Sequence, residues 1–494
     1  MSLLVERIFG MVVIATDLAT PKSDVLRYMA MTRAKSVMIL VRVQRWAGIS
    51  PSGGLQDSRT HGLSFTSIKI EFGLPSGDRT HDLQNKRQCA KKIDIDLPDS
   101  GTYDGAMKIT SIETYPVGAG WKNWLFIRVM TDQDGLYGIS EATLNGFIKT
   151  TEAAIHELSH LVIGRDPHDV NAISRTVIET VQDAGHIHRL AMSAVEVACW
   201  DILGKSLGVP IYQLLGGKQR ESILGYANGW YRAERTPEAF VTAADVVVDL
   251  GFRAVKLDPF GQSFGTIEEE DLQLSYDILA ALRSRFEPGF KILIDVHSRF
   301  IPSESLRVAR FLEPLDLYWW EEPTRDEREA MTNEIALQSP IRIATGEQFD
   351  KIGQFETLAQ GGGVSIWQPE PMSLGGITNT IAVANIARAN NAVIAPHQSG
   401  GPVATATCLQ LAACVENYLI QEHFDATNEA WTRDLITWHP EIDQSNGHLS
   451  FPTAPGLGID LNLEAIEEHP YDPDAFFNLH EEGWEQRIGS RDSE

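Results

Sequence analysis

Three short apolar runs of equal spacing constrain the fold of this chain more than any other feature. Each run ends on a carboxylate, at Asp295, Glu321 and Glu347. A step of 26 residues leads from Asp295 to Glu321, and a second step of 26 residues leads from Glu321 to Glu347. One buried strand, one helix and two short loops fit such a period, so the runs predict βα units around a parallel sheet.

The carboxylates at the ends of these strands predict a metal site. In a β/α barrel the C-terminal strand ends meet at the catalytic face, so the three side chains are expected to converge there. Three converging carboxylates repel unless a cation lies between them, and oxygen ligands without Cys or His favour Mg²⁺. The alternative is that each acid caps a helix or ends a strand in solvent. Because all three acids recur at one period, we favour the metal site.

Length, charge and cysteine content limit the class of protein. The 494 residues are enough for two or three domains, and the 43% hydrophobic content is ordinary for a globular protein. A net charge of −25 argues against nucleic acid or an anionic membrane as the main partner. Four cysteines without a CxxC pair favour a reducing compartment, so we expect a cytoplasmic protein. We find no apolar run long enough to cross a membrane.

Changes in periodicity divide the chain into four segments. Residues 1–104 have Gly, Ser and Pro clusters and little periodicity, which predicts a poorly ordered extension or an artefact of the assigned reading frame. Residues 105–222 read as three strands followed by helices, a small α+β domain. Residues 223–430 alternate strands and helices as in a TIM barrel. Residues 431–494 are expected to pack on both domains. The eight barrel strands are predicted at 224–227, 254–257, 292–295, 318–321, 343–345, 364–367, 392–395 and 418–421.

Nearly every predicted barrel strand from the second onward delivers an ionisable group to the same mouth. Residues i and i+2 of a strand share a face, so Lys256 and Asp258 point the same way. His297 likewise shares a face with the metal ligand two residues before it. Later strand ends carry Glu370, His397 and Glu422. Purely structural strand ends are not so uniformly charged.

The positions of Lys256 and His397 indicate proton transfer at carbon. Alone, Lys256 would be a solvated strand end and His397 a core histidine bonded to backbone. Together they flank the metal strands, so that a metal-bound substrate would lie between them. The metal would stabilise the enediolate that forms when a proton next to a carboxylate is removed. His297 could then donate a proton to a leaving hydroxyl group.

Six short motifs give the region 107–471 a specific resemblance. They are Ser193-Ala-Val-Glu-Val-Ala-Cys-Trp-Asp-Ile202, Glu321-Glu-Pro323, Thr345-Gly-Glu347, Gln368-Pro-Glu370, Gly375-Gly-Ile-Thr378 and Ala395-Pro-His397. The region resembles the enolase superfamily, mandelate racemase subgroup, and within it the sugar-acid dehydratases of the galactonate type. The resemblance implies a capping domain over a modified barrel, one Mg²⁺, a homo-oligomer and a small sugar acid as substrate.

The resemblance also implies roles for individual residues. Mg²⁺ would be bound by the three carboxylates at the ends of the equally spaced runs. His397 would be the base, polarised by Glu370, and His297 the acid that expels hydroxide. Glu422 would hydrogen-bond the substrate carboxylate. The expected reaction is dehydration of an aldonate or aldarate to a 2-keto-3-deoxy acid.

Two departures from the family pattern leave alternatives open. Glu370 stands where the usual partner of the histidine is Asp, and the second strand has Lys-x-Asp where racemases have Lys-x-Lys. Asp258 would therefore either hold Lys256 as an ammonium ion or bind substrate hydroxyls. The alternative functions are a racemase, epimerase or cycloisomerase acting on a sugar acid or lactone, and a non-catalytic homologue. Further substrate contacts are expected from Trp121, Asn123 and Arg299.

Overall fold

The computed structural model describes residues 107–180, 185–325, 329–424 and 428–484, together with five strands within residues 13–96. The chain forms two compact units, Met1–Ala106 and Met107–Glu494. Within the described residues, the helices are all too short or too polar to cross a lipid bilayer.

The N-terminal unit contains an antiparallel sheet with strand order β1-β2-β3-β4-β5. Residues 1–104 show little periodicity as a whole, yet Ile68, Ile70 and Phe72 alternate with polar residues as strand residues do. The other residues of 1–104, on which the prediction of a poorly ordered extension depends, lie outside the described residues. The strands are β1 (Val13–Ile14), β2 (Val25–Ala30), β3 (Met38–Gln44), β4 (Ser67–Gly73) and β5 (Lys92–Asp96).

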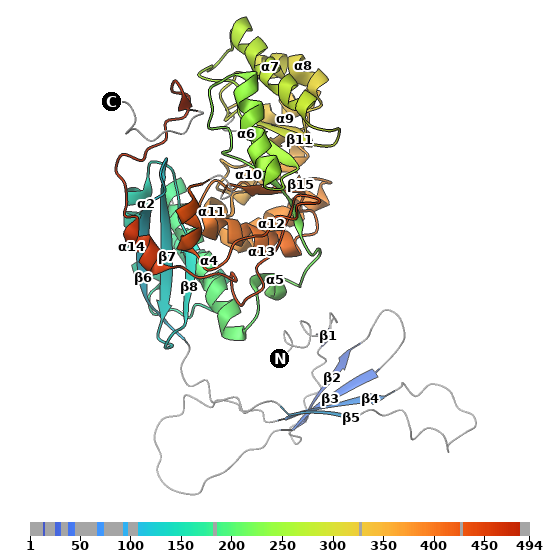
Figure 1. Cartoon of the computed structure of the whole chain (residues 1–494). Helices are drawn as coiled ribbons and strands as arrows, with labels where there is room; N and C mark the ends of the chain where they lie inside the picture. The colour runs from blue at the N-terminus through green and yellow to red at the C-terminus, as the bar shows by residue number, and fades with distance from the viewer. Residues whose placement is uncertain are drawn as a thin grey trace, which may run out of the picture. The chain divides into compact units, whose positions relative to one another are not determined.

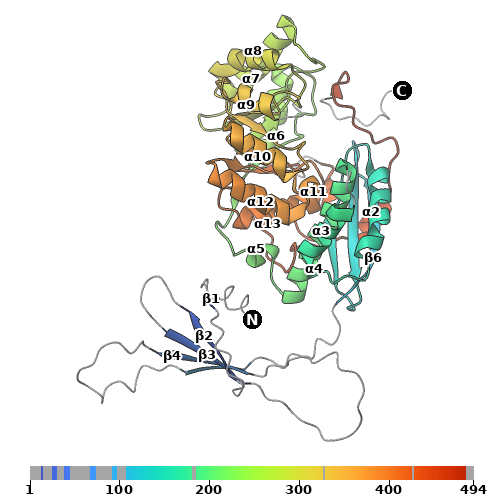
Figure 2. The same ribbon diagram turned by 180° about the vertical axis from the view of Figure 1, so that it is seen from behind.

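The second unit begins with an α+β domain, which we call the cap. Its antiparallel sheet has the order β6-β7-β8, with the middle strand almost entirely buried. Helices α2, α3 and α4 lie on one face of this sheet (Figures 1 and 2). The elements are β6 (Ile109–Gly118), β7 (Asn123–Thr131), β8 (Tyr137–Glu141), α2 (Ile148–Val162), α3 (Val170–Thr180), α4 (His186–Leu207) and the short α5 (Ile211–Leu214).

A barrel of parallel strands follows the cap. Neighbouring strands pair in the order β15-β14-β13-β12-β11-β10-β9-β16. A parallel bridge between Ile394 and Tyr418 links β15 to the residues just before β16, so the sheet curls back on itself. The strands are β9 (Ile223–Ala227), β10 (Ala254–Leu257), β11 (Lys291–Asp295), β12 (Trp319–Glu321), β13 (Ile343–Thr345), β14 (Ile366–Trp367), β15 (Val393–Ile394) and β16 (Gln421–His423).

Helices surround the barrel, and one apolar residue from each strand region fills its centre. That inner layer consists of Tyr226, Ala254, Leu293, Trp319, Ala344, Ile366, Ala395 and Ile420. Residues two positions further along each strand lie at the mouth of the barrel. The helices are α6 (Pro237–Asp249), α7 (Glu269–Arg285), α8 (Pro302–Leu312), α9 (Ala330–Ala336), α10 (Ile352–Gly361), α11 (Pro371–Leu374), α12 (Gly376–Ala389) and α13 (Pro402–Cys414), with a 3₁₀ turn η1 (Glu313–Leu315) after α8.

The predicted α/β class, a modified TIM barrel with an α+β cap, is confirmed. One strand was misplaced: the eighth was predicted at 418–421, but β16 begins at Gln421. It pairs with β9 from Gln421 onward, whereas Tyr418 makes only the bridge to Ile394. The chain therefore changes neighbour within the apolar run, which hydrophobicity alone does not reveal.

The described C-terminal residues, 431–484, contact both domains. Strand β17 (His448–Leu449) pairs with β9 of the barrel. Pro470 forms a bridge with Val117 at the end of β6 in the cap. The 3₁₀ helix η3 (Ala430–Leu435) precedes β17, and α14 (Leu463–Glu468) lies between β17 and Pro470.

Buried polar side chains of helix α4 connect the cap to the barrel. Ser193 Oγ accepts a hydrogen bond from Gly375 N at 2.8 Å. The Glu196 carboxylate accepts bonds from the N–H groups of Ile377 and Thr378, at 2.9 and 3.0 Å, in the first turn of α12. These bonds satisfy N–H groups that have no partner within the helix. Burial raises the pKa of Glu196 to about 7.

Candidate active site

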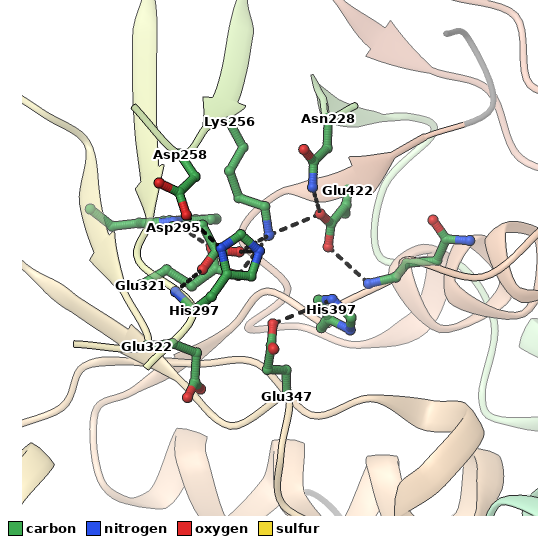
Figure 3. Close-up of polar contacts among 12 residues, drawn as sticks. Asn228, Lys256, Asp258, Asp295, His297, Glu321, Glu322, Glu347, His397 and Glu422 are labelled. Atoms are coloured by element: carbon green, nitrogen blue, oxygen red, sulfur yellow. Dashed lines mark hydrogen bonds and ion pairs between the residues drawn. The ribbon is translucent and has the colours of Figure 1, made fainter. Parts of the chain in front are cut away.

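The three predicted metal ligands meet at the mouth of the barrel. Asp295 and Glu321 are the last residues of β11 and β12 and are direct register partners. Glu347 follows β13 by two residues. One carboxylate oxygen from each lies within 4.8 Å of the others, and Figure 3 shows the side chains pointing toward one another. Asp295 and Glu321 are buried, and Glu347 is partly buried.

The chemistry of this cluster fits a hard divalent cation. Burial, and then the charge of Asp295, raise the pKa of Glu321 well above its usual range, although Lys256 opposes the shift. Glu347 Oε2 is buried and accepts no hydrogen bond from the described residues, although His397 Nε2 lies 3.3 Å away. Close carboxylates with an unsatisfied oxygen are costly without a positive charge, and an all-oxygen donor set suits Mg²⁺.

Lys256 lies among the acids as an ammonium ion. Its Nζ is 2.6 Å from Glu321 Oε1, 2.9 Å from Glu422 Oε1 and 3.3 Å from Asp295 Oδ2. Burial lowers the pKa of Lys256, but the charges of Glu321 and Glu422 more than offset this and hold the pKa well above its usual value. Lys256 therefore contributes positive charge beside the predicted metal ligands.

His297 is held in place by Asp258. Its Nδ1 lies 2.8 Å from Asp258 Oδ2, and the Arg299 guanidinium also pairs with Asp258. Arg299 is buried and donates a further bond to Gly261 O at 2.7 Å. The side chains of Asp258 and Arg299 are thus both paired with groups of this chain. Asp258 contacts His297 and Arg299, and the substrate contacts predicted for Asp258 and Arg299 stay predictions.

His397 is held in a similar way by Glu370. His397 Nδ1 lies 2.8 Å from Glu370 Oε2, so the longer side chain does reach the imidazole. The other oxygen, Oε1, accepts a bond from Met372 N at 3.0 Å and caps α11. Burial lowers the pKa of His397, but Glu347 and Glu370 raise it to about 10. Glu347 Oε2 is 3.3 Å from His397 Nε2. A cation among the carboxylates would offset the negative charge of Glu347 and so lower the pKa of His397.

Glu422 supports the floor of the site. Its carboxylate accepts bonds from Asn228 Nδ2 at 2.7 Å and from Gln398 N at 2.8 Å, in addition to the ion pair with Lys256. Glu422 is fully buried and does not line the cavity described below, and its contact with the substrate carboxylate stays a prediction. Sequence reasoning missed Asn228, although it follows the first barrel strand at a strand-end position like the others.

Strained backbone fixes two of the loops that carry these groups. His297, Ser298 and Glu322 adopt left-handed conformations, with φ of 48°, 56° and 45°. Ser298 donates from N and from Oγ to Glu322, both at 2.9 Å, and Glu322 also accepts from Gly346 N at 2.9 Å. Such conformations cost about 1–3 kcal/mol each and cluster at functional sites. Glu322, the second acid of the Glu-Glu-Pro motif, therefore ties together the loops that carry His297 and Glu347.

A cavity of about 290 Å³ opens above the cluster. Trp121 lines it, as predicted for a substrate contact. Asn123 does not, because its amide bonds the backbone of Asp472 and Ala475. Sequence reasoning also missed a third wall, which comes from the C-terminal residues. The cavity is lined by Asn228, Asp295, His297, Glu347, Glu370 and His397 of the barrel, by Trp121, Lys122 and Glu141 of the cap, and by Phe477, Leu479 and Trp484.

Comparison with known proteins identifies the family. Residues 115–216 match the N-terminal domain of mandelate racemase / muconate lactonizing enzyme, and residues 239–466 match the enolase C-terminal domain-like family. D-galactonate dehydratase of Pectobacterium atrosepticum is 32% identical over 369 residues, which cover 73% of this chain and 94% of the relative. The chain belongs to the enolase superfamily. The resemblance predicted from the motifs is therefore confirmed.

Other members of the enolase superfamily extend the comparison. D-gluconate dehydratase of Thermoproteus tenax is 32% identical over 361 residues, which cover 72% of this chain and 71% of that protein. The crystal structure of a mandelate racemase/muconate lactonizing enzyme from Jannaschia sp. CCS1 superposes with a TM-score of 0.68 at 30% identity, covering 74% of this chain and 98% of the other.

Proposed function

We propose that this chain is a Mg²⁺-dependent dehydratase that converts an aldonate or aldarate into a 2-keto-3-deoxy acid. The observation that carries the proposal is a pair of histidines, each held at Nδ1 by a carboxylate, beside one cluster of three acids. The D-gluconate and D-galactonate dehydratases among its relatives support the same reaction class.

The first step would be removal of the proton next to the substrate carboxylate. Glu370 accepts the Nδ1 proton of His397, which leaves Nε2 to act as the base. Asp295, Glu321 and Glu347 would hold Mg²⁺, which when bound supplies positive charge for the substrate carboxylate as negative charge develops. Lys256 adds an ammonium charge at the same place.

The second step would be loss of the hydroxyl group from the neighbouring carbon. His297 donates its Nε2 proton to the departing oxygen, and the electron pair left by the first step forms a carbon–carbon double bond. Water leaves, and the enol product tautomerises to the 2-keto acid by taking up a proton at the third carbon and losing the proton of its enol hydroxyl group. Asp258, fixed by Arg299, keeps His297 oriented and stabilises its protonated form.

Racemisation is less consistent with the contacts of Lys256. Proton exchange from both faces of the α-carbon would need a neutral amine, whereas three carboxylates within 3.3 Å favour the ammonium form. A non-catalytic role is less consistent with the retained acid cluster and the two supported histidines.

A substrate screen tests the proposal directly. The purified full chain would be incubated with a library of aldonates and aldarates, with Mg²⁺ in D₂O, and both keto-acid formation and α-deuterium uptake would be measured. A keto acid that disappears with EDTA is the expected result. Deuterium uptake without a keto acid would replace dehydration by racemisation. Failure of both, with no Mg²⁺ binding by calorimetry, would contradict any catalytic assignment.

A further inference from the structure

The C-terminal residues 471–484 have almost no regular secondary structure, yet hydrogen bonds hold them against the cap. Asn123 accepts a bond from Asp472 N at 2.8 Å and donates to Asp472 O at 2.7 Å. It also donates to Ala475 O at 3.1 Å, and Asn145 Nδ2 donates to Phe477 O at 2.9 Å. Asn123 begins β7, and Asn145 lies in the cap loop before α2, so these two cap residues fix the course of the segment.

The same segment is also attached to the barrel. Trp484 is only 4% exposed, although it is the last residue that the structure describes. Its indole Nε1 donates to Gly261 O at 3.0 Å, in the loop that follows β10. The segment leaves α14 on the cap and rises past the edge of the cap sheet (Figure 1). It therefore connects both domains at the active-site mouth.

Ring contacts between the two attachments form one continuous series, which we call the aromatic arc. Phe424, next to β16, stacks on Trp121 of the cap at 5.8 Å between ring centroids. Trp121 meets Phe477 edge to face at 5.1 Å, and Phe477 lies 6.0 Å from Trp484. Trp484 in turn meets His297 edge to face at 5.8 Å. The arc thus runs from the barrel through the cap and the C-terminal segment and ends on the proposed acid.

Trp484 contacts both His297 and Arg299, the residue that pairs with Asp258, the partner of His297. Asp258 fixes one ring nitrogen of His297, but the histidine side chain is 23% exposed and borders the cavity. The Trp484 ring packs against this imidazole and also lies 5.7 Å from the Arg299 guanidinium, which holds Asp258. A ring in this place limits the rotation of His297 about its side-chain bonds.

We propose that Trp484 is a positioning residue for His297. This inference rests on the proposed dehydration, in which His297 is the acid. It assigns Trp484 to the second step, the loss of hydroxide. The metal ligands and His397, which serve the first step, have no part in the contact.

The two steps can be separated experimentally in full-length Trp484→Ala and Trp484→Phe variants. We expect Trp484→Ala to lower kcat for keto-acid formation at least tenfold, while α-deuterium uptake and the Kd for Mg²⁺ change less than threefold. Trp484→Phe retains a ring and should stay within threefold of the wild type. Trp431→Ala is the matched control, because Trp431 also stacks on a histidine, His469, outside the cavity. Unchanged turnover in Trp484→Ala, or parallel loss of both steps, would overturn the inference.

A second measurement needs no substrate and separates this inference from the proposed function. Diethyl pyrocarbonate labels accessible imidazoles, and peptide mass spectrometry reports the rate at each histidine. We expect Trp484→Ala to raise the labelling rate of His297 at least threefold and to leave that of His397 within twofold. If the wild type dehydrates no sugar acid but this result is obtained, only the proposed function fails. An unchanged rate at His297 would refute the positioning role.

Discussion

The two carboxylate oxygens of Glu370 accept hydrogen bonds from two different donors. A Glu370→Gln variant, which keeps only one acceptor oxygen, tests whether His397 is the base. Oε1 accepts from Met372 N, and Oε2 accepts from His397 Nδ1. Glutamine has one acceptor oxygen. The backbone N–H of Met372 cannot change its role, whereas an imidazole can move its proton. The amide oxygen should therefore face Met372, and the amide N–H₂ should donate to His397 Nδ1.

That arrangement places the remaining proton on His397 Nε2, the atom that must accept the substrate proton. A charge-assisted hydrogen bond contributes about 1.5–3 kcal/mol, which corresponds to roughly 10- to 150-fold in rate. The wrong tautomer adds to this loss, and a comparable Asp-to-Asn change in a serine-protease triad lowers kcat about 10⁴-fold. We expect kcat to fall roughly 10³- to 10⁴-fold.

The assay is keto-acid formation together with α-deuterium uptake, because both require the base. Glu370→Asp is the control, since it keeps the charge and matches the family pattern; we expect it to stay within about tenfold of the wild type. Mg²⁺ affinity should be unchanged in both variants. A Gln variant within tenfold of the wild type would refute the reasoning, as would a matching loss of Mg²⁺ binding.

Three further predictions concern the acid, the metal site and stability. His297→Asn should abolish keto-acid formation but leave α-deuterium uptake; loss of both would contradict a separate acid. Glu347→Gln should weaken Mg²⁺ binding at least about 100-fold by calorimetry, since even groups that only support a ligand contribute 10- to 100-fold. Burial raises the pKa of Glu196 from 4.5 to about 7 in the folded protein. Between pH 4.5 and 7 Glu196 is therefore protonated in the folded protein but ionised in the unfolded chain. The contribution of Glu196 to the free energy of unfolding should therefore fall by about 3 kcal/mol as pH rises through that window. Urea unfolding at pH 5 and pH 8 measures this difference, and Glu196→Gln should remove it. An equal difference in the variant and the wild type would refute the prediction.

The barrel and the acid cluster were predictable from the sequence because both follow from periodic features. Buried parallel strands form apolar runs, and a residue at the end of each run must face the same mouth. The convergence of Asp295, Glu321 and Glu347 needed only this rule and equal spacing. Strand alternation predicted that His297 shares a face with Asp295, but β11 ends at Asp295 and His297 lies in the turn that follows.

The contacts that surround these residues were not predictable, because they depend on turns and on distant parts of the chain. The left-handed turn at His297 and Ser298 places the imidazole beside Asp258, and no pattern in the sequence marks this turn. The burial of Arg299 was not predictable, because an exposed position could not be told from a buried one. Trp484 lies in coil nearly 190 residues after His297 and has no periodic signal.

The bonds between helix α4 and the barrel determine how a substrate can enter. Ser193 and Glu196 are buried and hold the first turn of α12, so the cap cannot swing away from the barrel as a rigid body without breaking them. Opening is therefore left to the loops at 119–122 and 143–146 and to the segment 471–484. We therefore expect substrate to enter by movement of these loops and of the segment 471–484, with the cap and the barrel keeping their relative positions.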